Sequence, residues 1–339
     1  MRSEITIDLR AVQHNARTLL RALDGAELWA VVKSDAYGHG AIECSGAALD
    51  AGATGLCVAT VGEGLELRAR FPEPRILVLG PTAPGDVAAA RDAGLAVTVP
   101  DGRIPEDVEV HLKLDTGMGR WGLSELPAPT RRVAGLMTHL ATADTDIAFA
   151  REQIERFRTA TAAFPAGLVR HVANSAAALR LPESRFDAAR CGIALYGLSP
   201  FGLDPAADGL RPVLSWRSEV AQVKLLHAGE STGYRRRFVA GRDTWIAIVP
   251  VGYGDGFRRD LGGTEVLVGD DPARVVGVVS MNAVAVELGA PVAAGAPVTL
   301  VGPGVPLEAH AEVAGTITYE LACGIGSSAA RTPRTVVDA

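Results

Sequence analysis

Only three of the 33 basic residues in this chain are lysines, Lys33, Lys113 and Lys224, and the rest are arginines. Arginine keeps its proton inside a protein, whereas a lysine amine can lose its proton on burial and then form a Schiff base or a carbamate. Lysines that persist in a chain that otherwise uses arginine are therefore better candidates for chemistry than usual. For Lys224, an ordinary surface position is an equal alternative.

Lys33 directly follows the apolar run 30–32, which favours a position at the end of a β-strand. The segment 33–40 then combines this lysine with Tyr37 and two glycines. An isolated lysine at a strand end usually buries its aliphatic stem and keeps its amine in water. Here the scarcity of lysine and the composition of the loop favour a Schiff-base lysine instead.

Lys113 lies within an apolar run, so its amine is expected to point into the protein interior, where a bare ammonium group is costly. An ion pair with Asp115 and conversion to a carbamate by carbon dioxide are the two remedies, and the local sequence leaves both open. Arg120 follows a glycine-rich turn and could bind a carboxylate through two parallel hydrogen bonds. A carbamylated Lys113 could hold that guanidinium in place.

Two further segments, 171–175 and 190–197, end the seventh and eighth strands that we expect. In an eight-stranded α/β barrel, the loops after these strands commonly bind phosphate through backbone N–H groups and a hydroxyl. Ser175, Gly192 and Ile193 fit that role. The dipeptides Asn-Ser and Gly-Ile that contain these residues are each common by themselves. Their order on consecutive strand ends is the stronger signal.

Tyr253 lies between two glycines in the segment 252–257, where its side chain can project freely. A tyrosine in such a turn is more often a packing or interface residue than a catalytic base, so pocket geometry has to decide. The segment 277–282 resembles a strand end whose backbone N–H groups could contact a ligand.

The elements that must position these residues change character along the chain. Eight short β-rich runs alternate with mostly helical stretches, which indicates parallel βαβ units closing into a barrel. The runs are 28–32, 55–60, 76–79, 95–99, 108–114, 133–140, 168–173 and 187–194. The connection 100–107 is too short and too rich in Pro and Gly to form a full helix. After about residue 209, strand-like segments separated by Gly, Pro and Asp turns predict a second domain that is mostly β.

We therefore expect a TIM-type (β/α)8 barrel over residues 1–211 and a mostly β domain over 212–339, with the first few residues packing on the second domain. The formal net charge of −6 gives no basic footprint for nucleic acid. No apolar run reaches the ~20 residues needed to span a membrane, and no secretory signal precedes the first helix. The four cysteines are scattered, so no metal site is indicated. A cytoplasmic enzyme is the expectation.

Seven blocks carry a specific resemblance when they are taken in order. They are VVKSDAYGHG, KLDTGMGR, MTHLATAD, HVANSA, RCGIALYG, VGYGDGF and SMN. Together they resemble the alanine racemase family, which uses pyridoxal 5′-phosphate (PLP) on a barrel followed by a β domain. The resemblance extends from about residue 5 to residue 334, and it implies interconversion of L- and D-alanine, the latter a peptidoglycan precursor.

The resemblance also implies a role for each block. Lys33 would bond PLP and act as the base on the D face of the substrate. Tyr253 would be the base on the L face, reaching the barrel of the partner subunit in a head-to-tail homodimer, and His139 would contact that tyrosine. Arg190 would hydrogen-bond the pyridine nitrogen and be steadied by His171.

The remaining roles concern the phosphate and the substrate. By the resemblance, the phosphate is bound by Tyr37, Ser175, Gly192 and Ile193, with Asn174 beside them. Arg120 and the backbone of Met281 would hold the carboxylate of the small amino-acid substrate, with Lys113 as the possible carbamate.

Three departures from the family pattern bear on the substrate. Asn282 stands where the family usually has Asp, Cys191 replaces the usual proline, and the segment 323–334 lacks a tyrosine that ordinarily helps with the phosphate and the entry channel. These changes surround the substrate carboxylate and the entrance. A racemase of serine or of a broader set of amino acids is therefore an alternative. A non-catalytic PLP-binding protein is another, and PLP decarboxylases of similar build would carry a cysteine in place of Tyr253.

Overall fold

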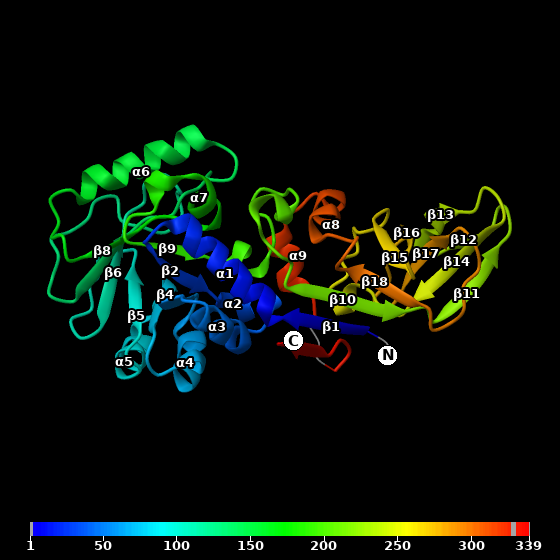
Figure 1. Ribbon diagram of the computed structural model, residues 1–339, viewed down its shortest axis with the longest axis horizontal. Coiled ribbons are helices and arrows are strands. Elements are labelled where there is room, and N and C mark those ends of the chain that lie inside the picture. Colours follow the sequence, from blue (N-terminus) through cyan, green and yellow to red (C-terminus); the bar gives the residue numbers. More distant parts are fainter. Residues whose placement is uncertain (1–2, 327–329, 339) are drawn as a thin grey trace. The chain divides into compact units, whose positions relative to one another are not determined.

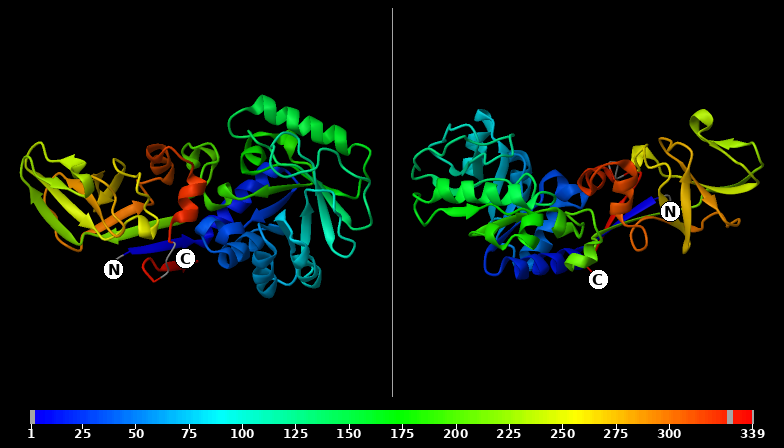
Figure 2. Two further views of the ribbon diagram at one scale, coloured as in Figure 1. Left: turned by 180° about the vertical axis from the view of Figure 1, so that it is seen from behind. Right: turned by 90° about the horizontal axis from the view of Figure 1, so that it is seen from above.

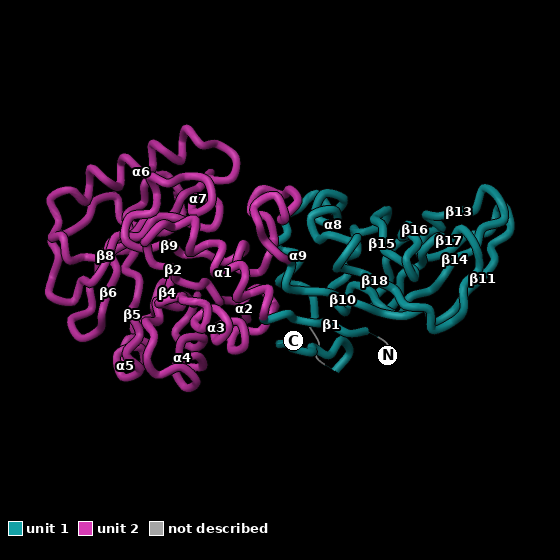
Figure 3. The backbone as a smooth tube through the Cα atoms, in the orientation of Figure 1, with its two compact units in different colours: residues 1–9, 212–339 teal, residues 10–211 magenta. Residues whose placement is uncertain are grey.

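The computed structural model describes residues 3–326 and 330–338. It divides into two compact units. The first unit, Arg10–Arg211, is drawn in magenta and labelled unit 2 in Figure 3, and the second unit, Met1–Leu9 together with Pro212–Ala339, is drawn in teal and labelled unit 1. The start of the chain therefore groups with the second half of the sequence. Residues 327–329 lie outside the described part. They belong to the segment 323–334, which differs from the family pattern.

The first unit is a closed barrel of parallel strands, as the alternating pattern predicted (Figure 1). Backbone pairing of Trp29 with Arg190 joins the first barrel strand to the last. The strands in chain order are β2 (Glu27–Val31), β3 (Gly55–Val58), β4 (Arg75–Pro81), β5 (Ala96–Val99), β6 (Glu109–Lys113), β7 (Val133–Met137), β8 (Val169–His171) and β9 (Ala188–Cys191). Closure places all their C-terminal ends on one rim.

Helices cover most of the outside of this barrel, and Figure 2 shows α6 (Ile147–Thr161), in green, along its exterior. The Asp146 side chain caps α6 by accepting from the Phe149 N–H, and Thr60 and Glu63 form a reciprocal capping box at α4. The helices are α1 (Leu9–Leu23), α3 (Ala41–Asp50), α4 (Val61–Arg70), α5 (Val87–Asp92), α6 (Ile147–Thr161) and α7 (Ser175–Arg180). The segment labelled α2 (Lys33–Gly38) is a left-handed turn in its interior.

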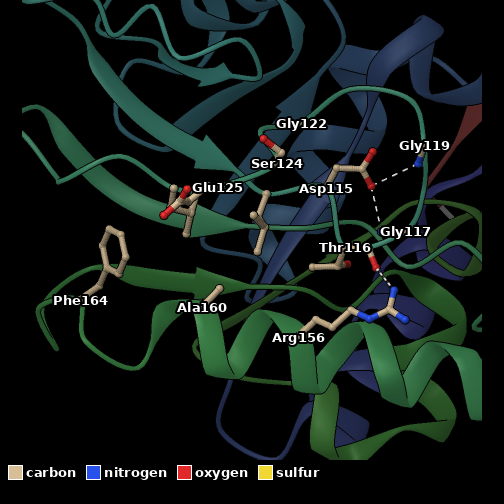
Figure 4. Close-up of a pocket in the computed structure, with 12 residues that line it drawn as sticks. Asp115, Thr116, Gly117, Gly119, Gly122, Ser124, Glu125, Arg156, Ala160 and Phe164 are labelled. Atoms are coloured by element: carbon tan, nitrogen blue, oxygen red, sulfur yellow. Dashed lines mark hydrogen bonds between the residues drawn. The ribbon is translucent and has the colours of Figure 1, made fainter.

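Two consecutive barrel connections, 100–108 and 114–132, contain no helix, and both lie within the described residues. The first was predicted, and the second was not. In the second, Gly117, Gly119 and Gly122 all have positive φ, and Pro127 and Pro129 follow, so neither half of the connection suits a helix. An open depression of about 840 Å³ lies against this connection, lined by residues that include Glu125 and Arg156 (Figure 4).

The second unit is mostly β, as predicted. Its nine-stranded sheet has the order β11-β14-β17-β16-β15-β18-β10-β1-β19 in the described residues. Its members are β1 (Ser3–Asp8), β10 (Leu214–Glu219), β11 (Gln222–Leu226), β14 (Thr244–Val249), β15 (Glu265–Val268), β16 (Asp271–Val276), β17 (Val284–Leu288), β18 (Pro297–Val301) and β19 (Arg334–Val337). A small ribbon, β12 (Ser231–Thr232) with β13 (Phe238–Val239), and the helices α8 (Leu307–Ala314) and α9 (Thr318–Gly324) complete it.

The N-terminal strand β1 is an integral part of this sheet. It pairs antiparallel with β10 and parallel with β19. The buried Trp216 of β10 donates its indole N–H to the hydroxyl of Ser3 at 2.7 Å, which satisfies a polar group in the core. Across the described residues, the helices are all too short or too polar to cross a membrane.

Candidate active site

Five of the candidate residues converge on the C-terminal rim of the barrel. Lys33 follows β2, Lys113 ends β6, His139 follows β7, His171 ends β8, and Arg190 lies near the end of β9. Because the strands are parallel and the barrel is closed, these side chains come from positions far apart in sequence and meet at one end. The location is the one where barrels of this type carry their chemistry.

An unusual backbone conformation follows Lys33. Residues 34–37 all lie in the left-handed region, with φ between 52° and 54°, although none of them is glycine. Such a conformation costs roughly 1–2 kcal/mol per residue and persists only where the surroundings hold it. The Asp35 carboxylate accepts from the Ala41 N–H at 2.8 Å, and the Glu63 carboxylate accepts from the amide directly after Lys33 at 2.8 Å. This turn delivers the Tyr37 side chain into the interior.

Tyr37 and the loops after β8 and β9 form a compact cradle. The Ser175 hydroxyl accepts from the N–H groups of Gly192 at 3.1 Å and Ala194 at 3.4 Å. A Cβ at position 192 would lie 2.5 Å from the Tyr37 hydroxyl, so glycine is required there. The structure therefore brings Tyr37, Ser175 and Gly192 together, and Ile193 directly follows.

Asn174 stands beside this cradle with its side chain already engaged. Its amide oxygen accepts from the Ala177 N–H at 3.0 Å and caps α7. This contact gives Asn174 a local structural function and fixes the direction in which the loop leaves β8.

Arg190 is buried and fixed from several sides. One terminal nitrogen, Nη1, donates to Nδ1 and to the carbonyl of His171, both at 2.7 Å, and the other, Nη2, donates to the Thr138 carbonyl at 2.8 Å. Burial lowers the pKa of the guanidinium to about 10, so Arg190 stays positively charged at neutral pH. A charged donor held in this way cannot rotate to follow a ligand, and the ligand must adapt to it.

The contact with Arg190 determines the tautomers of two histidines. Arginine can only donate, so His171 Nδ1 must accept, and a neutral His171 carries its hydrogen on Nε2. That atom lies 2.7 Å from Nδ1 of the buried His111, which in turn leaves the hydrogen of His111 on Nε2, 3.9 Å from a Glu109 carboxylate oxygen. The sequence analysis did not assign His111 to the site, because a histidine in an apolar strand gives no such signal.

The rim is strongly positive. Burial, followed by repulsion from Arg190 and Arg120, lowers the pKa of Lys113 to about 8. Burial, followed by the positive charges of Arg190 and Lys113, holds the pKa of His139 well below its ordinary value. The coulombic effect of Lys33 acts in the same direction on both groups. Cations gathered in this way against their own repulsion are typical of a site for an anionic ligand.

Trp121 belongs to this rim and was not anticipated. The guanidinium of Arg120 lies 5.1 Å from the centre of the Trp121 ring, and the Lys113 amine lies 5.7 Å from it. The Asp115 carboxylate accepts from the backbone of Gly117 and Gly119, as the dashed lines in Figure 4 show. Asp115 thereby shapes the glycine-rich turn that leads to Arg120.

The second unit contains its own pair of candidate residues. Tyr253 begins a short 3-10 turn, η6 (Tyr253–Asp255), and its side chain is exposed. Its backbone N–H donates to the Ser280 carbonyl at 3.1 Å, and the N–H of Gly254 donates to the Met281 carbonyl at 2.9 Å. The structure therefore places Tyr253 and Met281 on neighbouring loops of one unit.

Comparison with protein-family models gives two matches that together cover nearly the whole chain. Residues 7–200 match the model described as alanine racemase, N-terminal domain, and residues 213–335 match the model described as alanine racemase, C-terminal domain.

Individual proteins agree with the family models. The chain is 39% identical over 371 residues to an alanine racemase of Lactiplantibacillus plantarum, covering 99% of this chain and 98% of that protein. It is 38% identical to alanine racemase 1 of Bacillus subtilis, covering 97% and 91%. Among solved structures, alanine racemase from the D-cycloserine producer Streptomyces lavendulae matches with a TM-score of 0.91 and 35% identity, over 100% of this chain and 98% of that one. The biosynthetic alanine racemase from Pseudomonas aeruginosa gives a TM-score of 0.92 at 33% identity, over 99% and 100%.

Proposed function

The chain belongs to the alanine racemase family, and on that basis we propose that it binds PLP at the barrel rim and interconverts L- and D-alanine. The observation that carries the proposal is the rim itself, where Lys33 stands among Lys113, Arg120 and Arg190 and where Tyr37, Ser175 and Gly192 come together. An anionic cofactor that bonds to a lysine amine suits this combination.

The residues present fit PLP. The group needs a lysine amine, an anion-binding loop and a partner for its ring nitrogen. Lys33 offers the first, the loop around Gly192, where a Cβ would collide with the Tyr37 hydroxyl, offers the second, and the immobile Arg190 offers the third. When bound, PLP supplies an electron sink that acidifies the α-hydrogen of the amino acid attached to it.

Arg190 determines how strongly that sink acts. Because the guanidinium keeps its proton at neutral pH, it would donate to the ring nitrogen of a bound PLP and would leave that nitrogen unprotonated. A ring held in this state would withdraw electrons less strongly, and Arg190 would thereby favour return of a proton to the α-carbon over transamination or decarboxylation. His171 and the Thr138 carbonyl keep the guanidinium in its place.

Two bases on opposite faces of the α-carbon carry out the inversion. We assign Lys33 to the D face and Tyr253 of the partner subunit in a homodimer to the L face. His139 is neutral at pH 7 because of its lowered pKa. Its Nδ1 faces Nη2 of Arg190 at 3.4 Å and accepts, so its Nε2–H is left to donate to a phenolic oxygen. The homodimer is thus a requirement of the mechanism, because each barrel needs a tyrosine from its partner.

Arg120 and the backbone N–H of Met281 are assigned to the substrate carboxylate. Lys113, whose pKa is lowered to about 8, presents a neutral amine in part of the population at physiological pH, and only the neutral amine adds to carbon dioxide. The resulting carbamate would offset the positive charge at the rim and orient Arg120. We therefore propose Lys113 as a carbamylation site.

The test of the proposed function is exchange of the α-hydrogen in heavy water. Purified protein with added PLP is incubated with each common L-amino acid and followed by proton NMR together with chiral analysis. Exchange with inversion of alanine alone supports an alanine racemase. Inversion of serine or of several amino acids supports the alternative that Asn282, in place of the usual Asp, resets specificity. Binding of PLP without exchange of any amino acid would overturn the proposal in favour of a non-catalytic PLP-binding protein.

A further inference from the structure

We propose that Arg331 is a positioning residue, which fixes the loop that contains Tyr253 relative to the loop that contains Met281. Asn282 completes the hydrogen bonds of Arg331. The inference concerns only the second unit, and it rests on the proposed function for the meaning of Tyr253 and Met281. The sequence analysis gave Arg331 no role.

The first part of the argument is a buried ion pair. The Asp255 side chain is fully buried, and both of its carboxylate oxygens are engaged by Arg331, from Nε at 2.9 Å and from Nη2 at 2.8 Å. The same carboxylate accepts from the N–H of Gly252 at 3.0 Å. A buried carboxylate depends strongly on its cation, so Arg331 is what permits Asp255 to hold the turn that begins with Tyr253.

The second part is the contact of the same guanidinium with the other loop. With its amide oxygen turned toward the cation, Asn282 accepts from Nη1 of Arg331 at 2.7 Å and also from Nη2. A Cβ at Gly254 would lie 3.0 Å from Nη1, so the guanidinium packs directly on the residue after Tyr253. One planar group therefore contacts residues adjacent to both Tyr253 and Met281.

The third part is that the two loops are already in close contact, so a small shift in one displaces the other. Tyr253 and Gly254 donate their N–H groups to the carbonyls of Ser280 and Met281. A side chain at Gly252 would collide with the Ser280 carbonyl. Because the loops pack so closely, neither can shift without moving the other, and the planar guanidinium group is rigid. Arg331 thus acts on the phenol and on the Met281 backbone through Asp255 and Asn282.

Asn282 is uncharged, so it adds no second negative charge beside Arg331. With an amide at this position, Arg331 is balanced by one buried carboxylate, and the pair is neutral. Aspartate at position 282 would keep an acceptor for the guanidinium, whereas alanine would remove it. The two substitutions at one position therefore separate loss of the contact, which only alanine causes, from loss of the amide group, which both cause.

The decisive experiment measures exchange and inversion separately, starting from D-alanine in heavy water with the holoenzyme. On the proposed assignment, Lys33 removes the α-proton from the D face, and a deuteron returns either from the same face, with retention, or from Tyr253, with inversion. At saturating D-alanine, where weaker binding of the carboxylate by Met281 no longer limits the rate, we expect inversion in Arg331→Lys to fall on the order of tenfold or more, while exchange with retention falls by less than about twofold. The ratio of exchange to inversion therefore rises.

Variants at position 282 and a surface control complete this experiment. Asn282→Ala is expected to raise the ratio of exchange to inversion by a smaller factor than Arg331→Lys does. Asn282→Asp is expected to keep the wild-type ratio. Arg217→Lys, on an exposed position of β10 in the same unit, is the matched control and should leave the ratio unchanged. If Arg331→Lys does not fold, the pair of variants at 282 still carries the test.

A readout without cofactor separates this inference from the proposed function. Amide hydrogen exchange of the protein stripped of PLP should show faster exchange at Tyr253 and Gly254 in Arg331→Lys than in Arg217→Lys. Unchanged amide exchange, or a proportional fall of α-exchange and inversion in every variant, would overturn the positioning role. Wild-type protein that exchanges no amino acid would instead contradict the proposed function, and the amide exchange would still decide the role of Arg331.

Discussion

Nη1 of Arg190 lies 2.7 Å from Nδ1 of His171, and this single contact fixes both the direction of a buried positive charge and the tautomer of a buried histidine. The arginine can only donate, so the imidazole must accept. Its other nitrogen then donates to His111 at 2.7 Å, which extends the ordered array into the barrel.

Replacing His171 by Leu should destabilise the protein. The substitution leaves Nη1 of the buried Arg190 with fewer acceptors, and an unsatisfied buried charged donor costs about 1–3 kcal/mol or more. We expect a loss of about 2–4 kcal/mol in the free energy of unfolding, measured by chemical denaturation. His227→Leu is the control, because that histidine contacts Asp243 at the surface, where its loss should leave the free energy of unfolding nearly unchanged.

Gly192→Ala should weaken binding of PLP by an order of magnitude or more. The added Cβ would lie 2.5 Å from the Tyr37 hydroxyl, so either the tyrosine or the loop must move out of the proposed phosphate cradle. Titration of the stripped protein with PLP, followed by absorbance, measures the change. Gly167→Ala, where a Cβ meets nothing within 4 Å, should bind PLP as the wild type does. Equal affinities for the two variants would show that the cradle is not the phosphate site.

Carbamylation of Lys113 should increase as the pH rises through 8. The pKa of this amine is lowered from 10.5 to about 8, chiefly by burial, and only the unprotonated form adds to carbon dioxide. With ¹³C-bicarbonate, a carbamate signal in the NMR spectrum should grow between about pH 7 and pH 9. Lys113→Arg should abolish the signal, and Lys224→Arg, at an exposed position, should retain it.

The same shift has a consequence for stability in buffer free of carbon dioxide. Because the folded state binds fewer protons than the unfolded state between pH 8 and 10.5, stability should rise with pH across that window. Below pH 8 the amine is protonated in both states, and Lys113 adds no slope. Denaturation curves at several pH values should show this gain in the wild type, and Lys113→Met should lose it.

Shared active sites can be tested by mixing two inactive variants. Lys33→Ala and Tyr253→Phe each remove one proposed base from every site of their own homodimer. After dissociation and reassociation at equal amounts, a heterodimer contains one site with both bases intact. Half of the dimers are then mixed and half of their sites are competent, so about a quarter of wild-type activity should return. If mixing restores nothing while the heterodimer is detected by mass spectrometry, Tyr253 does not act in the partner's barrel.

Much of the architecture was readable from the sequence because strand and helix periodicities are local properties. The eight barrel strands, the change to a mostly β texture and the missing helix after β5 all follow from apolar spacing and from Pro and Gly. The scarcity of lysine directed attention to Lys33 and Lys113, and the structure places both at the barrel rim.

Other features depend on tertiary contacts, and the sequence carries no local signal for them. The left-handed run 34–37 contains no glycine and is held by Glu63 and Ala41, which follow it in other helices. His111 acquires its place only because barrel closure brings β6 and β8 close enough for their histidines to meet. Trp121 joins the rim because the glycine-rich turn folds back onto Lys113.

In the second unit, the contributions of the sequence and of the tertiary structure can be separated most clearly. The sequence by itself determined that Tyr253 and Met281 lie in glycine-rich or strand-end loops, because those preferences belong to each segment separately. Only the tertiary structure decided that Arg331 joins them, since a guanidinium finds its carboxylate and amide partners by the packing of the folded chain. Hydrogen bonds between distant segments are selected by the whole fold, and no pattern within either loop specifies them.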